Sequence, residues 1–133
     1  MRINYETIVK DTDPRLRKKS APIDVPLSAK HLALAKRMLR YVKDSRDEDK
    51  AEKYNLKPAV GLAAPQVGEF IQIIMVMVDQ EEGDPKVYLL ANPKIIAHSV
   101  QQAALKGGEG CLSVEIFHEG FVKRAARITV RAY

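Results

Sequence analysis

The chain has 133 residues and a net charge of +5, with 46% hydrophobic and 29% charged residues. This composition is typical of one domain, residues 1–133, whose core needs no disulfides, and the single cysteine excludes a disulfide framework within the chain. No apolar run approaches the roughly 18 residues of a membrane span, and the charged opening lacks the apolar stretch of a signal peptide. We therefore expect a cytoplasmic protein without membrane contact. Acidic residues are interspersed among the basic ones, so we expect no specific nucleic-acid site.

The first third of the chain predicts an irregular arm and one helix. Pro14, Pro22 and Pro26 lie in the arm. The charged residues 44–53 suit either a solvated turn of helix or a loop, and the Lys57-Pro58 step ends any helix there. Between them, starting from Ser28 as the predicted N-cap, apolar residues recur at the spacing of an amphipathic helix: Leu32, Leu34, Ala35, Met38, Leu39, Tyr41 and Val42.

The rest of the chain predicts strands. Residues 70–78, rich in Ile and Val, suit a buried strand, and the segments 87–90 and 94–100 suit two more around Asn92-Pro93. Turns are expected at 80–86 and 106–108. The last segment alternates, which predicts a half-buried strand with Ile128, Val130 and Ala132 on its apolar face. The alternation is still running at Tyr133, so we expect the whole protein to continue beyond it.

Two short segments differ from ordinary core or surface sequence. The first, Val60-Gly61-Leu62-Ala63-Ala64-Pro65-Gln66, combines small residues that permit close backbone approach with one amide side chain. A tight bend capped by Gln66 explains it as well as a functional site does. The second, Glu109-Gly110-Cys111-Leu112-Ser113, surrounds the only cysteine with glycines and a carboxylate. Most lone cysteines are small buried residues, but such neighbours favour a metal ligand or a nucleophile.

In this order the two segments resemble the first two of the three signature motifs of peptide deformylases. The resemblance extends to Asn92-Pro93-Lys94, to His98-Ser99-Val100-Gln101 and to the arm from Asp13-Pro14-Arg15-Leu16-Arg17 onward. It holds particularly for the longer form found in Gram-positive bacteria. The resemblance implies an α+β fold, in which an N-terminal helix precedes mixed or antiparallel strands around a metal-binding cleft and a C-terminal helix completes the cleft.

The resemblance also implies a function and a set of site residues. Peptide deformylases are metal-dependent hydrolases that remove the N-formyl group from the N-formylmethionine of nascent polypeptides, with Fe²⁺ expected and Ni²⁺, Co²⁺ or Zn²⁺ as replacements. Cys111 would be a thiolate metal ligand, and the Gln66 amide and the Leu112 N–H would stabilise the oxyanion on the formyl oxygen. Val60 and Gly61, together with Gly110, would bind the substrate, the first two as a strand edge. Glu109 would support a ligand rather than act as the base.

The third family motif, His-Glu-x-x-His on a helix, is absent from this sequence. His118-Glu119 begins like it, but Val122 stands where the second histidine is required. We therefore interpret His118 as a surface or loop histidine, His31 as solvated and His98 as a strand residue. Because the helix that carries this motif is missing, we expect the chain to be the N-terminal portion of a longer deformylase. One thiolate cannot hold a divalent ion in a defined geometry, so we expect this portion to be inactive by itself. Ala59 replaces a glycine common in the family, which costs stability only if its φ is positive.

Two other interpretations remain open. A degenerate deformylase that ends near Tyr133 could bind peptides or the ribosome without catalysis, although its last strand would then expose an apolar face. A metal-independent cysteine hydrolase could pair Cys111 with His98 or His118, but no spacing supports this. The sequence leaves the metal and the oligomeric state undetermined.

Overall fold

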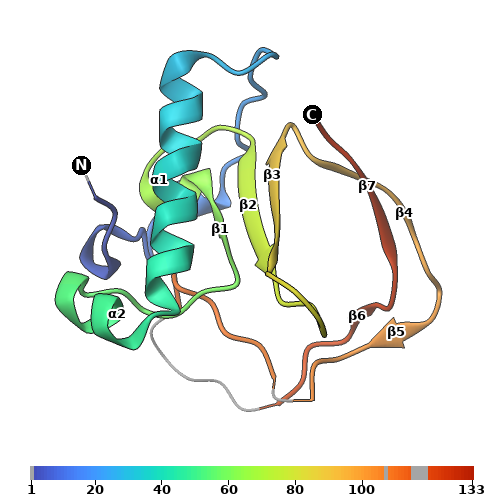
Figure 1. Ribbon diagram of the computed structural model, residues 1–133. Coiled ribbons are helices and arrows are strands. Elements are labelled where there is room, and N and C mark those ends of the chain that lie inside the picture. Colours follow the sequence, from blue (N-terminus) through green and yellow to red (C-terminus); the bar gives the residue numbers. More distant parts are fainter. Residues whose placement is uncertain (1, 107, 115–119) are drawn as a thin grey trace.

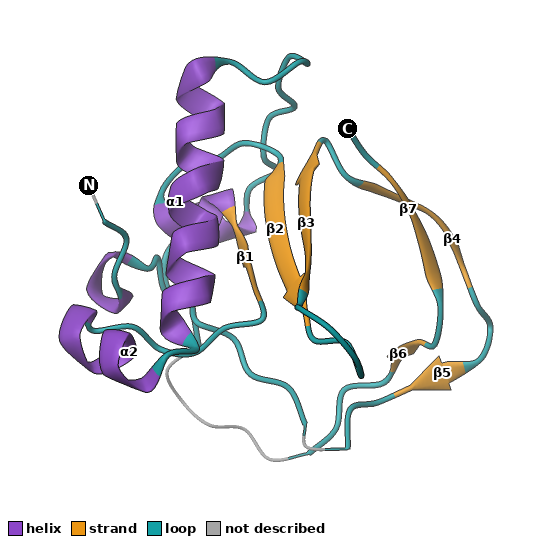
Figure 2. Ribbon diagram, viewed as in Figure 1, coloured by secondary structure: helices purple, strands orange, loops and turns teal. Residues whose placement is uncertain are grey.

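The structure, a computed structural model, describes residues 2–106, 108–114 and 120–133. In these residues two helices accompany antiparallel strands, which form a three-stranded sheet and two separate ribbons (Figure 1, Figure 2). This is the predicted α+β arrangement. The helices are α1 (Ala29–Ser45) and α2 (Glu48–Tyr54), and the 3₁₀ turns are η1 (Tyr5–Thr7), η2 (Pro14–Arg17) and η3 (Ala64–Val67). The strands are β1 (Gly61–Ala63), β2 (Ile73–Val78), β3 (Lys86–Ala91), β4 (Lys94–His98), β5 (Gln102–Ala103), β6 (Arg124–Ala125) and β7 (Ile128–Arg131).

The predicted amphipathic helix is α1, and it begins where the sequence indicates. The Ser28 side chain accepts a hydrogen bond from the N–H of His31 and so caps the first turn. Leu34, Met38 and Val42 recur every fourth residue on one face and are buried in the core. Leu32 is exposed, so it lies at the margin of the buried stripe. None of the helices in the described residues has the length and apolarity needed to cross a membrane.

The charged segment after α1 forms a second, short helix. The Asp47 side chain accepts hydrogen bonds from the N–H groups of Asp49 and Lys50 and starts α2. Asn55, in the left-handed conformation, ends it before Lys57-Pro58 is reached. Of the two interpretations that the sequence left open here, the turn of helix is therefore confirmed.

The core lies between α1 and the three-stranded sheet, in which β2 is the central strand (Figure 1). Ile73, Met75 and Met77 alternate along β2 and are buried on the side of the core. The predicted strand over 70–78 is thus confirmed from Ile73 onward. The predicted turn over 80–86 ends one residue earlier than expected, because β3 begins at Lys86. Gly107, in the predicted turn at 106–108, lies outside the described residues.

The ribbon of β4 and β7 corrects one prediction. β7 is a strand, as the alternation indicates, but its residues are exposed, with Ile128 at 53% and Val130 at 39%. It pairs with β4, and no other described element covers its apolar face. The predicted half-burial is therefore wrong for the described structure, because alternation sets which side chains share a face and cannot supply what packs on it. After β7 the backbone of Tyr133 pairs with that of Ala91, joining the ribbon to the end of β3.

Candidate active-site cleft

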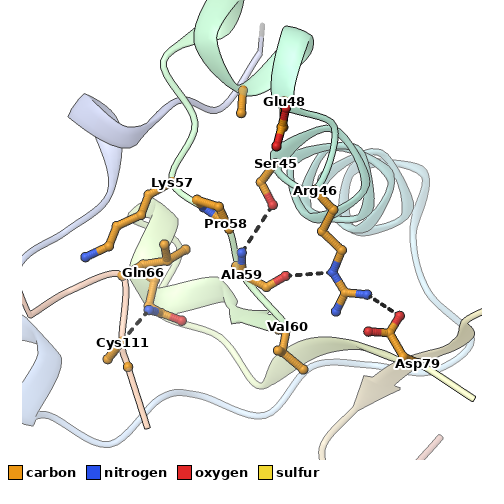
Figure 3. A pocket seen from close by; sticks show the side chains of 14 residues that line it. Ser45, Arg46, Glu48, Lys57, Pro58, Ala59, Val60, Gln66, Asp79 and Cys111 are labelled. Carbon is orange, nitrogen blue, oxygen red and sulfur yellow. Dashed lines mark hydrogen bonds and ion pairs between the residues drawn. The ribbon is translucent and has the colours of Figure 1, made fainter. Parts of the chain in front are cut away.

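A cleft of about 850 Å³ lies between the edge of β1, the end of α1 and residues 110–112 (Figure 3). Its lining includes four charged residues: Arg46, Glu48, Lys57 and Asp79. It also includes most of the site residues predicted from the sequence: Val60, Gly61, Gln66, Gly110, Cys111 and Leu112. In Figure 3, Lys57 lies on the side of Gln66 and Cys111, and Arg46 and Asp79 lie near Val60. Segments about 50 positions apart in the chain therefore meet at one surface.

Gln66 uses the two ends of its side chain for different contacts. Its Oε1 atom accepts a hydrogen bond from the Ala63 N–H at 2.9 Å and caps η3. This fixes the opposite end of the amide, whose Nε2 donates to Ser113 Oγ at 3.2 Å and lies 3.9 Å from Cys111 Sγ. The capping glutamine that the sequence suggested as an alternative is therefore present, and the same cap aims an N–H donor into the cleft.

β1 is an edge strand with a free side. The Val60 carbonyl accepts the Met77 N–H at 2.8 Å, and Gly61 is the next residue along. Because successive residues of a strand direct their backbone groups to opposite sides, the N–H and C=O of Gly61 face away from β2. A Cβ at Gly61 would lie 2.9 Å from the Met75 carbonyl oxygen, so close strand pairing requires glycine here.

The segment 110–113 is anchored at one end and open at the other. Cys111 is an exposed free thiol, whereas the Leu112 side chain is 5% exposed and belongs to the core. Ser113 is also buried, and its carbonyl oxygen accepts the Asp11 N–H at 2.8 Å. Within the described part of the chain, the Leu112 N–H donates no hydrogen bond.

Glu109 contacts a strand rather than the cleft. Its carboxylate forms three hydrogen bonds of 2.8–3.1 Å with the guanidinium of Arg124 on β6. These bonds to Arg124 hold the pKa of the Glu109 carboxyl below its ordinary value of 4.5. The carboxylate thus stays ionised and engaged, and it ties the segment before Cys111 to β6.

The histidines do not join Cys111 in the described residues. His98 lies in β4, with Nδ1 3.2 Å from the Ser99 carbonyl oxygen, and the N–H of His31 is bound to the N-cap of α1. His118 lies outside the described residues. Across 2–106, 108–114 and 120–133, no three His, Cys, Asp or Glu side chains are placed to hold a metal ion. These residues therefore do not fit a complete metal site; they offer one donor, the Cys111 thiol.

Several contacts of the site were not predicted from the sequence. Ser113 stands within the second motif, yet its bond to the Gln66 amide could not be foreseen from its position. Arg124 and Arg46 are single arginines among the 22 basic residues, and no local pattern distinguishes them. Ala59 is outside the left-handed region, because among the described non-glycine residues only Asn55 and Asn92 have positive φ. Alanine therefore imposes no backbone strain there.

Comparison with known proteins gives consistent matches. The sequence profile of the family described as polypeptide deformylase matches residues 5–133. The peptide deformylase of Oceanobacillus iheyensis is 45% identical over 130 residues, which are 98% of this chain and 71% of that protein. The peptide deformylase of Halalkalibacterium halodurans is 46% identical over 130 residues, with the same coverage.

Solved structures agree with this result. The crystal structure of a probable peptide deformylase from Synechococcus phage S-SSM7 superposes with a TM-score of 0.70 at 31% identity. The match covers 92% of this chain and 72% of the phage protein. The similarity thus extends over nearly the whole of this chain and about 70% of its relatives.

Proposed function

This chain belongs to the polypeptide deformylase family, and we propose that the cleft beside β1 is the part of that family's active site which it carries. Deformylases are hydrolases of protein biosynthesis, and they act on formylmethionyl nascent peptides. The resemblance in the sequence analysis is therefore confirmed, including its relation to Gram-positive enzymes. The alternative of a degenerate deformylase that binds peptides or the ribosome without catalysis is not favoured.

The observation that carries the proposal is the position of the Gln66 amide. Its Nε2 points to the exposed Cys111 thiol and is held there by the cap on the opposite end of the side chain. We propose that this N–H, together with that of Leu112, donates to the formyl oxygen as negative charge develops on it. Fixed donors at that point lower the barrier because they need no reorganisation during the reaction.

The free side of β1 would bind the peptide. The backbone of Gly61 can pair with an added strand, since its N–H and C=O face away from β2. Val60 would add its exposed side chain to this edge, while its carbonyl oxygen is held by Met77. Gly110 lines the opposite wall, where open space around its Cα leaves room for a peptide backbone. Backbone pairing of this kind tolerates many different sequences after the methionine.

Members of this family are metalloenzymes. We propose Cys111 as one thiolate ligand, because a soft charged donor at the cleft suits Fe²⁺ and its replacements Ni²⁺, Co²⁺ and Zn²⁺. Since the described residues contain no group of three His, Cys, Asp or Glu side chains that could hold an ion, we assign no reaction step to a metal. Glu109 supports the position of Cys111 through its contact with Arg124. For the metal-independent cysteine hydrolase, His98 contacts the Ser99 carbonyl oxygen instead of the Cys111 thiol, and the other proposed partner, His118, lies outside the described residues.

Cytoplasmic nascent chains at the ribosome are the proposed source of the substrate. The net charge of +5 favours encounter with polyanions, and the outward face of α1 exposes Lys36, Arg40 and Lys43. These residues suit a transient approach to the ribosome. We also retain the prediction that residues 1–133 form a single domain.

The test is a titration of the ¹⁵N-labelled chain with formyl-Met-Ala-Ser, followed by NMR. We expect shifts of the Gly61 backbone amide and the Gln66 side-chain amide, and none at Gly83 in the exposed 80–85 turn. Unformylated Met-Ala-Ser should move Gly61 but not Gln66, because it lacks the formyl oxygen. Shifts confined to residues outside the cleft would refute the proposed function.

A further inference from the structure

The last turns of α1 hold the backbone that leads into β1. Tyr41 Oη donates to the Lys57 carbonyl at 3.0 Å and accepts the Lys57 N–H at 3.1 Å. One helical turn later, Ser45 Oγ accepts the Ala59 N–H at 3.2 Å, and Arg46 Nε donates to the Ala59 carbonyl at 3.1 Å. Side chains from the end of α1 and its C-cap, Arg46, thus bond to all four backbone groups of Lys57 and Ala59. Figure 3 shows the two bonds to Ala59.

Arg46 extends this contact to the neighbouring strand. Its Nη2 donates to the Met77 carbonyl at 2.5 Å, and its Nη1 binds Asp79 at 3.0 Å. Met77 is the residue whose N–H donates to Val60, at the end of the β1–β2 pairing. A planar guanidinium can bridge two carbonyl oxygens in a fixed geometry, which a single ammonium group cannot do. Arg46 thus connects Ala59, in the segment before β1, to Met77 of β2, at the point where the regular pairing of the two strands ends.

This location gives the contact a consequence for ligand binding. Gly61 is two residues beyond Ala59, and its outward N–H and C=O form the free edge of the cleft. An edge that is already ordered loses less conformational freedom when a peptide pairs with it. Arg46 is itself only 22% exposed and lies at the cleft wall. Its loss should therefore loosen the edge without removing any atom that pairs with the peptide.

We propose that Arg46, supported by Ser45 and Tyr41, is a positioning residue that holds the peptide-binding edge at Gly61 in its pairing conformation. The inference rests on the proposed function for the role of that edge. It adds a part of the molecule, the C-terminal end of α1, to the binding of the formylmethionyl peptide. The guanidinium acts through the backbone of Ala59 and Met77 and does not touch the substrate.

The test compares Arg46→Met with Arg2→Met in the full chain. Arg2 is a matched control because its side chain is similarly exposed, at 23%, and forms an ion pair of 2.6 Å with Asp44. Neither Arg2 nor Asp44 lines the cleft. We expect Arg46→Met to weaken binding of formyl-Met-Ala-Ser by about tenfold, and Arg2→Met by less than about twofold. Arg46→Lys should restore part of the affinity, because one ammonium group can reach one of the two carbonyls.

Amide hydrogen exchange in the peptide-free chain provides a second measurement. Arg46→Met should accelerate exchange at Ala59 and Met77 but leave that of Met75 unchanged. Equal losses of peptide affinity in the two methionine variants would overturn the positioning role, and unchanged exchange would overturn the contact itself. If the unaltered chain binds no peptide while Arg46→Met still accelerates exchange, the proposed function of the cleft fails and the contact of Arg46 with the edge is upheld.

Discussion

At the scale of single residues, the Gln66 side chain has a structural contact at one end and, at the other, the donor to which we assign a role in the proposed function. An amide carries an acceptor and a donor at fixed separation, so the bond from the Ala63 N–H to Oε1 also determines where Nε2 points. Ser113 Oγ receives that donor at 3.2 Å beside Cys111. A substrate oxygen that replaced Ser113 as the acceptor would therefore find the N–H already oriented.

Gln66→Glu should separate these two roles. A carboxylate keeps the acceptor for the Ala63 N–H but has no donor, so η3 should persist while the donor to the formyl oxygen is lost. We expect affinity for formyl-Met-Ala-Ser to fall about tenfold, with a melting temperature within about 3 °C of the unaltered chain. Calorimetric titration and circular dichroism measure the two quantities.

Gln66→Leu serves as the control, because it removes the donor and the cap together. It should weaken peptide binding to a similar extent and also lower the melting temperature. Equal peptide affinity of Gln66→Glu and the unaltered chain would show that the amide donor does not contact the formyl group.

The pair of Glu109 and Arg124 predicts a pH dependence. Because the bonds to Arg124 lower the folded-state pKa of Glu109, its contribution to stability is present above the unfolded value of 4.5 and is lost as the pH falls through the folded value. Glu109→Gln should therefore have a lower melting temperature than the unaltered chain at pH 7. This difference in melting temperature should become smaller as the pH is lowered below 4.5. Melting temperatures measured from pH 7 to pH 3 test this.

The control is Glu82→Gln in the exposed turn over 80–85, which should show no such pH-dependent difference. A gap in melting temperature between Glu109→Gln and the unaltered chain that does not narrow from pH 7 to pH 3 would indicate that shape, rather than ionisation, determines the contribution of Glu109.

At the scale of elements, one asparagine fastens the N-terminal arm to the sheet. Asn92, between β3 and β4, accepts the Ile23 N–H and donates to the Ile23 carbonyl, each at 2.8 Å. Its φ of 51° places it in the left-handed region, where its own N–H reaches the Gln72 carbonyl. The Asn92 side chain thus bonds to both backbone groups of Ile23, as a neighbouring strand would, and fixes the N-terminal arm at this point.

Asn92→Ala should lower the free energy of unfolding by about 2–3 kcal/mol, through loss of both bonds to Ile23 and the strain of a left-handed alanine. Asn92→Gly loses the same bonds without that strain and should be about 1 kcal/mol less destabilised. Urea unfolding measures both values. Equal destabilisation of the two variants would mean that the left-handed conformation is not retained in Asn92→Ala.

The ribbon of β4 and β7 should be the least protected part of the strand structure. Its residues are exposed on both faces, whereas Ile73 and Met75 of β2 are almost fully buried. Local unfolding of this ribbon therefore exposes little apolar area that is buried in the folded chain, and it should cost little free energy. We expect amide exchange in β4 and β7 to be at least about tenfold faster than in β2, measured by NMR; equal protection would show that the ribbon opens only with the whole domain.

At the scale of the whole molecule, the cleft is assembled from parts that are remote in sequence. The end of α1, the edge of β1, the 3₁₀ turn η3 and residues 110–112 each contribute to its lining. The exposed Cys111 thiol is the proposed metal ligand, and the described residues contain no group of three His, Cys, Asp or Glu side chains that could hold an ion. The proposed peptide-binding edge consists of backbone groups of Gly61, so we expect it to bind a peptide without a metal ion.

A polypeptide of these 133 residues should release no formate from formyl-Met-Ala-Ser, even with added Fe²⁺, Co²⁺, Ni²⁺ or Zn²⁺. Its sequence has one cysteine and no His-Glu-x-x-His spacing, so it lacks the ligands and the base that the chemistry needs. The deformylase of Oceanobacillus iheyensis, assayed in parallel, is the positive control. Formate release that depends on Cys111 would contradict the prediction.

The sequence by itself determined the features that neighbouring residues control. The Ser28 cap, the periodicity of α1, the apolar strand β2 and the Gln66 cap each depend on residues within a few positions of one another, where local geometry suffices. The two motifs also identified the family. Only the tertiary structure decided which distant groups meet: the Gln66 amide with Ser113, Glu109 with Arg124, and Arg46 with Met77. It likewise decided that Ile128 is exposed, because burial depends on which element packs against a face.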